Sequence, residues 1–193
     1  MRITTLAGIG APVCFVTGWV VGGARARHYS LLHDAISQLA RIGAPTRSIM
    51  TAGFVGFGLL ALPWARALAR SLDDRRLLGS VGLAGLATLA VAALPLGGPL
   101  GDGAHAVAAG LGYLGMAASP LLGARSMTGK AKAASYAVGA VSAVCLAGSL
   151  AGGYDGGLQR LGLGVVDAWF VVMAIRSLRA PHELGAARPA AID

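Results

Sequence analysis

Six long apolar segments make up most of this 193-residue chain, and they constrain its fold more than any other feature. Each has close to the roughly 20 residues that an α-helix needs to cross about 30 Å of hydrocarbon. They lack the alternation of apolar and polar residues that is typical of membrane β-barrel strands. The predicted spans cover residues 6–22, 49–68, 77–96, 104–123, 133–152 and 158–178.

Composition supports a membrane protein independently of the segment lengths. Only 12% of the residues are charged, 55% are hydrophobic, and the mean hydropathy is +0.68. Soluble domains carry about twice this charged fraction. The sequence therefore predicts an all-α fold: a polytopic bundle of six transmembrane helices in a single domain, 1–180, followed by a short, disordered cytoplasmic tail, 181–193.

Glycine is abundant, with 30 residues, and several glycines have the spacing of helix-packing motifs. Gly18 with Gly22, and Gly148 with Gly152, form GxxxG pairs, whereas Gly79, Gly82 and Gly85 recur at every third position. Small residues at this spacing let membrane helices approach closely. We interpret them as packing contacts inside the bundle, and only secondarily as an interface with a second copy or another membrane protein.

The placement of the 16 lysines and arginines indicates how the chain sits in the membrane. Eleven lie on the side that holds both termini: Arg2, Arg66, Arg70, Arg75, Arg76, Arg125, Lys130, Lys132, Arg176, Arg179 and Arg188. Five lie on the other side: Arg25, Arg27, Arg41, Arg47 and Arg160. The positive-inside rule places both termini in the cytoplasm, across a bacterial-type plasma membrane. The basic loops carry few aromatic residues and no nucleic-acid module, so the expected partners are membrane lipids, not nucleic acid.

The first span also has an alternative interpretation. Arg2, the apolar segment and the run Ala24-Arg25-Ala26 imitate a secretory signal with its cleavage site. We favour a retained first helix, because an arginine inside the cleavage site and an even number of spans both fit an anchored segment.

The first outer connection, residues 23–48, is long for a loop and has a helical pattern. Ser30 is placed to cap a helix, Asp34 falls in its first turn, and Gly43 with Pro45 would end it. The residues expected on its apolar face are Leu32, Ala35, Ile36 and Leu39. The segment predicts a short amphipathic helix in the membrane interface between helices 1 and 2.

All three outer connections carry polar side chains that would meet at one end of the bundle. The candidate polar pocket comprises Ser30, His33, Asp34, Ser37, Asp102, His105, Asp155, Gln159 and Arg160. Under one interpretation these groups form a site for ligand binding or acid/base chemistry, with Ser30 or Ser37 as a nucleophile. Under the other they solvate loops, cap helices and contact lipid headgroups.

Zinc is the metal that this cluster could hold, through His28, His33, Asp34, Asp102 and His105. No HExxH, CxxC or GxSxG motif is present to support metal or hydrolytic chemistry. Cys14 and Cys145 lie inside spans and lack the spacing of a metal or redox motif. We therefore expect no cofactor, with zinc kept for the hydrolase alternative.

Asp167 lies about 13 Å along the sixth span, near the middle of the membrane. A carboxylate at that depth is costly and suggests a functional role. A neutral Asp167 that is hydrogen-bonded to a neighbouring helix is the structural alternative to a proton relay. The candidate partners are Thr17, Thr88, Tyr113, Tyr136 and Ser142.

Several segments, taken in order, resemble a known family. They are YSLLHDAISQLARIGAPTR, MTAGFVGFGLL, LPLGGPLGDGAH and GLQRLGLGVVDAW. Their arrangement is similar to that of the bacterial and archaeal membrane proteins grouped as domain of unknown function 998. The resemblance implies a six-helix membrane protein and no particular activity. Leu94 and Pro95 stand where family members tend to have a phenylalanine-proline turn, and the aspartate is displaced to Asp102.

Three functions are compatible with these observations. The first is a non-enzymatic membrane module that binds a lipid or a partner protein through the outer polar pocket. The second is a metal-dependent lipid hydrolase that uses the outer His/Asp/Ser cluster. The third is a small transporter, which would normally show internal repeats, broken helices and several intramembrane charges, whereas here only Asp167 qualifies.

Overall fold

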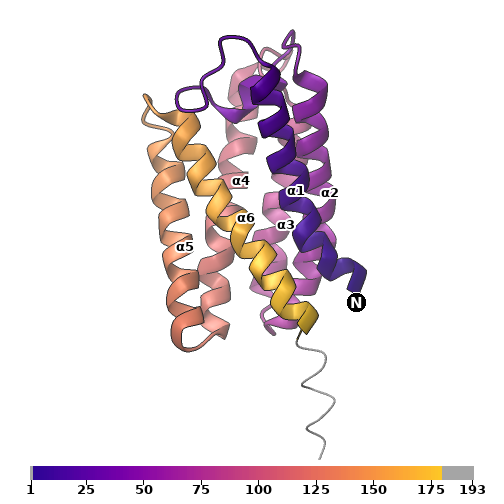
Figure 1. Cartoon of the computed structure of the whole chain (residues 1–193), viewed down its shortest axis with the longest axis vertical. Coiled ribbons are helices and arrows are strands. Elements are labelled where there is room, and N and C mark those ends of the chain that lie inside the picture. The colour runs from indigo at the N-terminus through magenta and orange to yellow at the C-terminus, as the bar shows by residue number, and fades with distance from the viewer. Residues whose placement is uncertain (1, 180–193) are drawn as a thin grey trace, which may run out of the picture.

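The computed structural model describes residues 2–179, and every regular element in that range is helical. The six long helices are α1 (Arg2–Arg25), α2 (Arg47–Ser71), α3 (Arg76–Ala93), α4 (Gly101–Gly123), α5 (Gly129–Gly148) and α6 (Asp155–Arg179). Two short 3-10 helices join them, η1 (Ile36–Ala40) and η2 (Ala124–Ser126). Figure 1 shows the long helices packed side by side in an elongated bundle. The upper end holds the α1–α2, α3–α4 and α5–α6 connections, and the lower end holds the other two.

All six long helices are long and apolar enough to cross a membrane. This confirms the predicted class, an all-helical multi-pass membrane protein. The predicted tail, 181–193, lies outside the described residues.

The helix boundaries differ from the predicted spans by a few residues, and the end of α3 and the start of α5 show how the local sequence sets them. Helix α3 ends at Ala93, because Leu94 precedes Pro95 and leaves the helical conformation with φ −115° and ψ 65°. Helix α5 begins earlier than predicted, at Gly129, after Thr128 in an extended conformation. Its first turn therefore carries basic residues that were assigned to the loop.

Glycines bring the first three helices into close contact. A Cβ atom on Gly18 of α1 would lie 3.1 Å from the Cα atom of Gly53 on α2. A Cβ on Gly85 of α3 would lie 3.1 Å from the carbonyl oxygen of Gly58 on α2. At these distances a side chain would force the neighbouring backbone to shift, as expected of small residues at membrane helix interfaces.

The glycine motifs do not all pack in this way. Gly22 faces Leu39 and Gly148 faces Leu158, in agreement with a packing role. A Cβ on Gly79, Gly82 or Gly152, in contrast, would meet no atom within 4 Å. Each of the three motifs therefore has at least one glycine at a packing contact. The packing interpretation is wrong for Gly79, Gly82 and Gly152.

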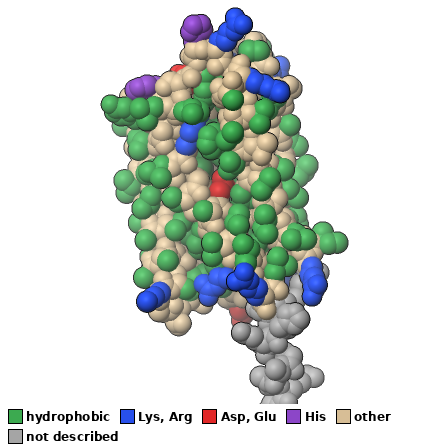
Figure 2. All heavy atoms as spheres, in the orientation of Figure 1, with side chains coloured by type: hydrophobic (Ala, Val, Ile, Leu, Met, Phe, Trp, Pro, Cys, Tyr) green, Lys and Arg blue, Asp and Glu red, His purple; other side chains and the backbone are tan. Residues whose placement is uncertain are grey.

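The surface has the pattern expected of a bundle surrounded by lipid. Figure 2 shows hydrophobic side chains along the middle of one face, with lysine and arginine side chains concentrated at its ends. Exposed large apolar residues occur on every long helix, among them Leu59, Leu86, Val107, Val144 and Val172. In a membrane protein such residues contact acyl chains and need no protein partner.

The upper α1–α2 connection differs from its prediction. In place of an amphipathic interfacial helix it contains only the five-residue 3-10 helix η1. Ala35, with φ −58° and ψ 145°, separates this helix from the turn that precedes it. Ile36, Leu39 and Ala40 are buried against the bundle and do not face the membrane interface. The connection therefore closes the upper end of the bundle.

Candidate functional site

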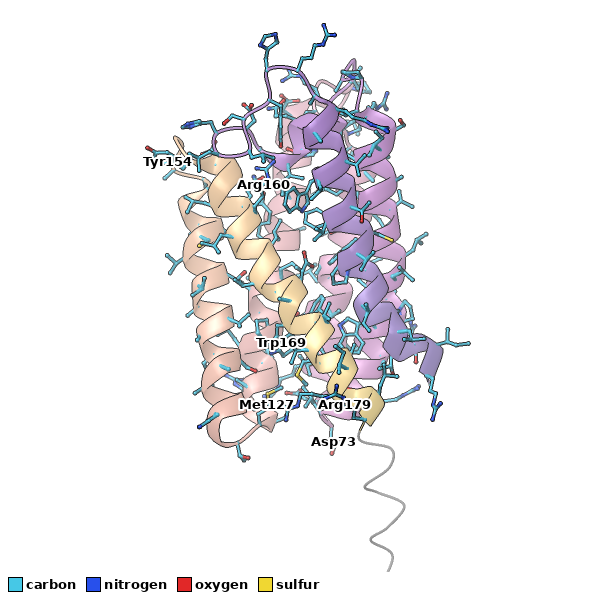
Figure 3. The ribbon with its side chains drawn as sticks, viewed as in Figure 1. Asp73, Met127, Tyr154, Arg160, Trp169 and Arg179 are labelled. Atoms are coloured by element: carbon cyan, nitrogen blue, oxygen red, sulfur yellow. The ribbon has the colours of Figure 1, made fainter. Side chains whose placement is uncertain are left out.

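Arg160, near the start of α6, fastens the α1–α2 connection to the bundle. Its Nη1 donates hydrogen bonds to the carbonyl oxygens of Leu31, at 2.6 Å, and Asp34, at 3.2 Å, and its Nη2 donates to the hydroxyl of Tyr29. The guanidinium carbon lies 5.4 Å from the ring centroids of both Trp19 and Tyr29. Figure 3 shows Arg160 at the upper end, beneath this connection. Its Nη1 and Nη2 are thus occupied by the chain itself, which favours a structural role, whereas its Nε is buried with no hydrogen-bond partner among the described residues.

The residues around Arg160 complete the attachment. Gly156 and Gly157 allow the start of α6 to approach the connection, because a Cβ on Gly156 would collide with the carbonyl oxygen of Asp34. The backbone N–H of Gly157 donates to the carbonyl oxygen of Leu32 at 2.8 Å. Gln159 accepts a hydrogen bond from the backbone N–H of Ile36 through Oε1, at 3.0 Å.

Ser30 and Asp34 form a closed turn. The Oγ atom of Ser30 accepts hydrogen bonds from the backbone N–H groups of Leu32, at 3.3 Å, and His33, at 3.2 Å. Asp34 accepts one in return from the backbone N–H of Ser30, at 2.7 Å. The capping role predicted for Ser30 is thus present, but it closes a turn and not a helix. The Oγ lone pairs are engaged by these two donors, which argues against a nucleophilic Ser30.

Tyr29 is the aromatic residue at the centre of this attachment, and the sequence analysis missed it. Its hydroxyl lies within hydrogen-bond distance of the carbonyl oxygens of Asp34, at 3.3 Å, and Ala35, at 3.1 Å. Burial raises the pKa of the Tyr29 phenol, and the positive charge of Arg160 opposes that rise in part. A tyrosine and a tryptophan near the end of a span, as with Tyr29 and Trp19, are a known interfacial signal. That signal could have identified both.

His33 joins the first and third upper connections. Its Nδ1 lies 2.7 Å from the carbonyl oxygen of Gly153, and its ring centroid lies 5.2 Å from that of Tyr154. Because a carbonyl oxygen only accepts, Nδ1 carries a proton in this contact. His33 is exposed, so this arrangement fixes the loops at the surface.

Asp102 and His105 organise the α3–α4 connection. Asp102 accepts a hydrogen bond from the backbone N–H of Gly97 at 2.7 Å. His105 donates from Nδ1 to the carbonyl oxygen of Leu94 at 2.7 Å, and it is only 5% exposed. The histidine therefore supplies a hydrogen-bond donor to a carbonyl oxygen at the C-terminal end of α3, where the helix ends before Pro95.

A cavity lies below η1, between five of the long helices. Its empty volume is about 550 Å³, with the space at its mouth included. Apolar side chains form most of its wall: Phe15, Phe54, Phe57, Val91, Met116 and Leu163. Five polar residues also line it: Ser37, Thr88, His105, Tyr113 and Gln159. The residues of α4 that line it fall on one helical face, from His105 to Met116.

The candidate pocket residues therefore separate into two groups. Ser37, His105 and Gln159 line the cavity. Ser30, His33, Asp34, Asp102 and Arg160 hold the connections through the hydrogen bonds described above. Asp155 begins α6, and its Oδ1 is buried with no hydrogen-bond partner among the described residues.

The proposed metal ligands do not form a common site. Within residues 2–179, no group of three or more His, Cys, Asp or Glu side chains is placed to hold a metal ion. The set predicted from the sequence was His28, His33, Asp34, Asp102 and His105. His28 is exposed, and the other four donate to or accept from backbone groups of the connections. Only His105 reaches the cavity.

Asp167 is buried in α6, and only 3% of its surface is exposed. Neither carboxyl oxygen has a hydrogen-bond partner among the described residues, so the predicted bond to a neighbouring helix is absent there. Ser142, one of the candidate partners, is itself buried and unpaired. Another, Thr88, donates to the carbonyl oxygen of Ala84 at 2.7 Å. Leu163, one turn above Asp167, lines the cavity, so the acid lies just below the cavity floor.

Comparison with known proteins gives a family but no activity. No curated protein and no solved structure matches the chain. A family model described as "Protein of unknown function (DUF998)" matches residues 9–176, which include all six long helices in whole or in large part. The chain therefore belongs to the DUF998 family, whose function is unknown.

Proposed function

We propose that this protein is a non-enzymatic membrane module that binds a lipid, or a similar amphipathic molecule, in the cavity below η1. The observation that carries the proposal is the composition of the cavity wall, in which aromatic and aliphatic side chains are combined with a few polar groups. Small-molecule sites are typically apolar cavities with a small number of orienting polar groups. An acyl chain would contact Phe15, Phe54 and Phe57, and a polar group would meet His105 and Gln159.

The arrangement of the upper end supports binding more than catalysis. Arg160 and His33 are engaged in holding the connections, and they are not free to act on a substrate. For the hydrolase alternative, Ser37 and His105 are the pair that line the same cavity. No hydrogen bond among the described residues joins them, and His105 uses Nδ1 for Leu94. We therefore place the metal-dependent hydrolase second and a transporter third.

We further propose that the upper end faces away from the cytoplasm, in a bacterial-type plasma membrane, with both termini inside. The excess of lysine and arginine at the lower end supports this orientation. Single cysteines would test it in a background in which Cys14 and Cys145 are alanine. On intact cells, a membrane-impermeant maleimide should label Leu100→Cys and not Lys130→Cys. The reverse pattern would overturn the orientation.

Filling the cavity tests the binding proposal. Ala109 of α4 lines the cavity, whereas Ala106 of the same helix is exposed at the bundle surface. Ala109→Phe should reduce the amount of lipid that copurifies with the protein and is detected by native mass spectrometry. Ala106→Phe, which adds the same group on the lipid-facing side, should leave it unchanged. Equal lipid retention in both variants, with both folded, would overturn the proposal.

A further inference from the structure

A second hollow, the lower groove, lies at the opposite end of the bundle from the cavity. It is formed by the ends of α2 and α6 together with the α4–α5 connection, and its empty volume is about 1050 Å³, open solvent included. Arg176 and Arg179 of α6 line it, as do the hydroxyl-bearing residues Ser126 and Thr128. Figure 3 shows Arg179 and Met127 at this end of the molecule.

The two arginines of the lower groove are available for a ligand. Both are exposed, and no hydrogen bond, ion pair or ring contact joins either guanidinium to another described residue. Arg160 at the upper end differs, because its guanidinium is engaged by backbone carbonyls and two aromatic rings. Two guanidinium groups that have no partner among the described residues, set beside hydroxyl donors, match the oxygens of a phosphate group.

The floor of the groove is held in place by a chain of hydrogen bonds. The indole N–H of Trp169 donates to Oγ of Ser135 at 2.9 Å, and that hydroxyl donates to the sulfur of Met127 at 3.1 Å. On one wall, the hydroxyls of Ser71 and Ser177 share a hydrogen bond of 2.7 Å between α2 and α6. The groove therefore has a fixed, partly apolar floor on the side of the bundle and a basic rim at its opening.

We propose that the lower groove binds the phosphate-bearing headgroup of an anionic phospholipid. Arg176 and Arg179 would pair with the phosphate oxygens, and Met127 and Met173 would contact the apolar part next to the headgroup. The groove lies at the ends of membrane-spanning helices, which is the depth of lipid headgroups. Two acids among the described residues lie at this end, Asp73 and Asp74, and neither lines the groove. Asp74 accepts a hydrogen bond from the backbone N–H of Arg76.

The chain supplies a matched control for this proposal. Arg66 and Arg70 lie in the final turns of α2 at the same end, are exposed, and do not line the groove. The double variants Arg176→Gln/Arg179→Gln and Arg66→Gln/Arg70→Gln remove the same charge. Affinities of the full-length protein for phosphatidylglycerol and phosphatidylcholine would be measured in detergent by native mass spectrometry.

We expect wild-type protein to prefer phosphatidylglycerol at least about tenfold. The groove variant should lose about thirtyfold in affinity for that lipid, which is about 2 kcal/mol at 1.4 kcal/mol for each factor of ten, because it removes the forked, charge-assisted hydrogen bonds to the phosphate. The control variant should lose less than about threefold. Equal losses in the two variants would reduce the effect to general surface charge and overturn the proposal.

Two further arms keep the test decisive. If the glutamine variant does not fold, Arg176→Lys/Arg179→Lys keeps the charge but removes the forked donor geometry, and it should lose about threefold to tenfold in affinity. Unchanged affinity in that variant would also overturn the proposal.

Deletion of residues 180–193 should leave the affinity unchanged. A tenfold rise would mean that this segment of the chain, and not lipid, is the occupant of the groove. The same variants measured in the Ala109→Phe background, in which the cavity is filled, should show the same loss of affinity, so the two proposals fail separately.

Discussion

The guanidinium of Arg160 lies over the ring of Tyr29 and donates a hydrogen bond to its hydroxyl. The two residues are 131 positions apart, and their contact ties the start of α6 to the α1–α2 connection. The same guanidinium also holds the backbone of Leu31 and Asp34. One side chain of α6 therefore holds three residues of this connection.

Replacing Arg160 with lysine should loosen the upper end. Lysine keeps the charge but cannot make the forked contacts or stack flat on the two rings. We expect Arg160→Lys to lower the free energy of unfolding by about 1–3 kcal/mol, measured by thermal unfolding in detergent. Hydrogen exchange of residues 26–46 should rise in parallel. Arg25→Lys, at an exposed arginine of the same end, is the control and should change neither. Unaltered hydrogen exchange in Arg160→Lys would show that Arg160 does not hold the α1–α2 connection in place.

The phenol of Tyr29 should titrate above its ordinary range. Burial raises its pKa, so the folded protein holds the phenol proton more tightly than the unfolded chain, whose tyrosines titrate near pH 10. The corresponding stability is complete below about pH 10 and declines as the pH rises above that value. The tyrosinate absorbance of wild type minus that of Tyr29→Phe should therefore reach its midpoint above pH 10. A difference signal that is half complete at or below about pH 10 would disprove the shift.

The close packing of α3 and α4 can be tested at one glycine. A Cβ on Gly115 would lie 2.6 Å from the backbone nitrogen of Ala84, and neither backbone can move independently of its helix. Gly115→Ala should lower the free energy of unfolding by about 1–3 kcal/mol. Gly110→Ala, on the same helix with no atom within 4 Å of the added Cβ, should be neutral or stabilise by up to about 1 kcal/mol. Equal stabilities of the two variants would show that the helices are not in contact there.

Much of the fold could be predicted from the sequence because each span carries its own signal. Twenty apolar residues must form a helix in lipid, since every backbone group has to be paired internally. Segments such as 104–123 therefore match their helices almost residue for residue, as α4, Gly101–Gly123, does. The α1–α2 connection could not be assigned in the same way. Its conformation is set by distant partners, above all Gly157, Gln159 and Arg160.

The candidate site shows the same division between local and long-range information. The sequence placed polar groups at the correct end of the bundle, but residue type alone could not separate ligands from loop anchors. His33 and Asp102 resemble metal ligands, yet each is engaged by a backbone group, at Gly153 and Gly97 respectively. The segment GLQR, which carried part of the family resemblance, is explained as the attachment point of that connection.

The structure reverses the effect on stability that the sequence alone predicts for Asp167→Leu. If a neighbouring helix supplied a hydrogen bond, Asp167→Leu would leave that partner unpaired and destabilise the bundle. Neither carboxyl oxygen has a partner among the described residues, so the buried polar group is itself a cost of about 1–3 kcal/mol. Leucine, of similar size and apolar, should therefore raise the free energy of unfolding by about that amount. Asparagine should leave it close to wild type.

The control for Asp167 is its neighbour Ala168, which is exposed at the bundle surface. Ala168→Leu adds apolar surface facing lipid and should leave thermal unfolding in detergent unchanged. A clear loss of stability in Asp167→Leu would reveal a partner for the carboxyl, such as a bound water or ligand reached through the cavity above it. A proton-carrying role makes a separate prediction. Asp167→Asn would then fold normally but fail to complement a strain that lacks the gene. An amide has the shape of the acid but cannot take up and release the proton.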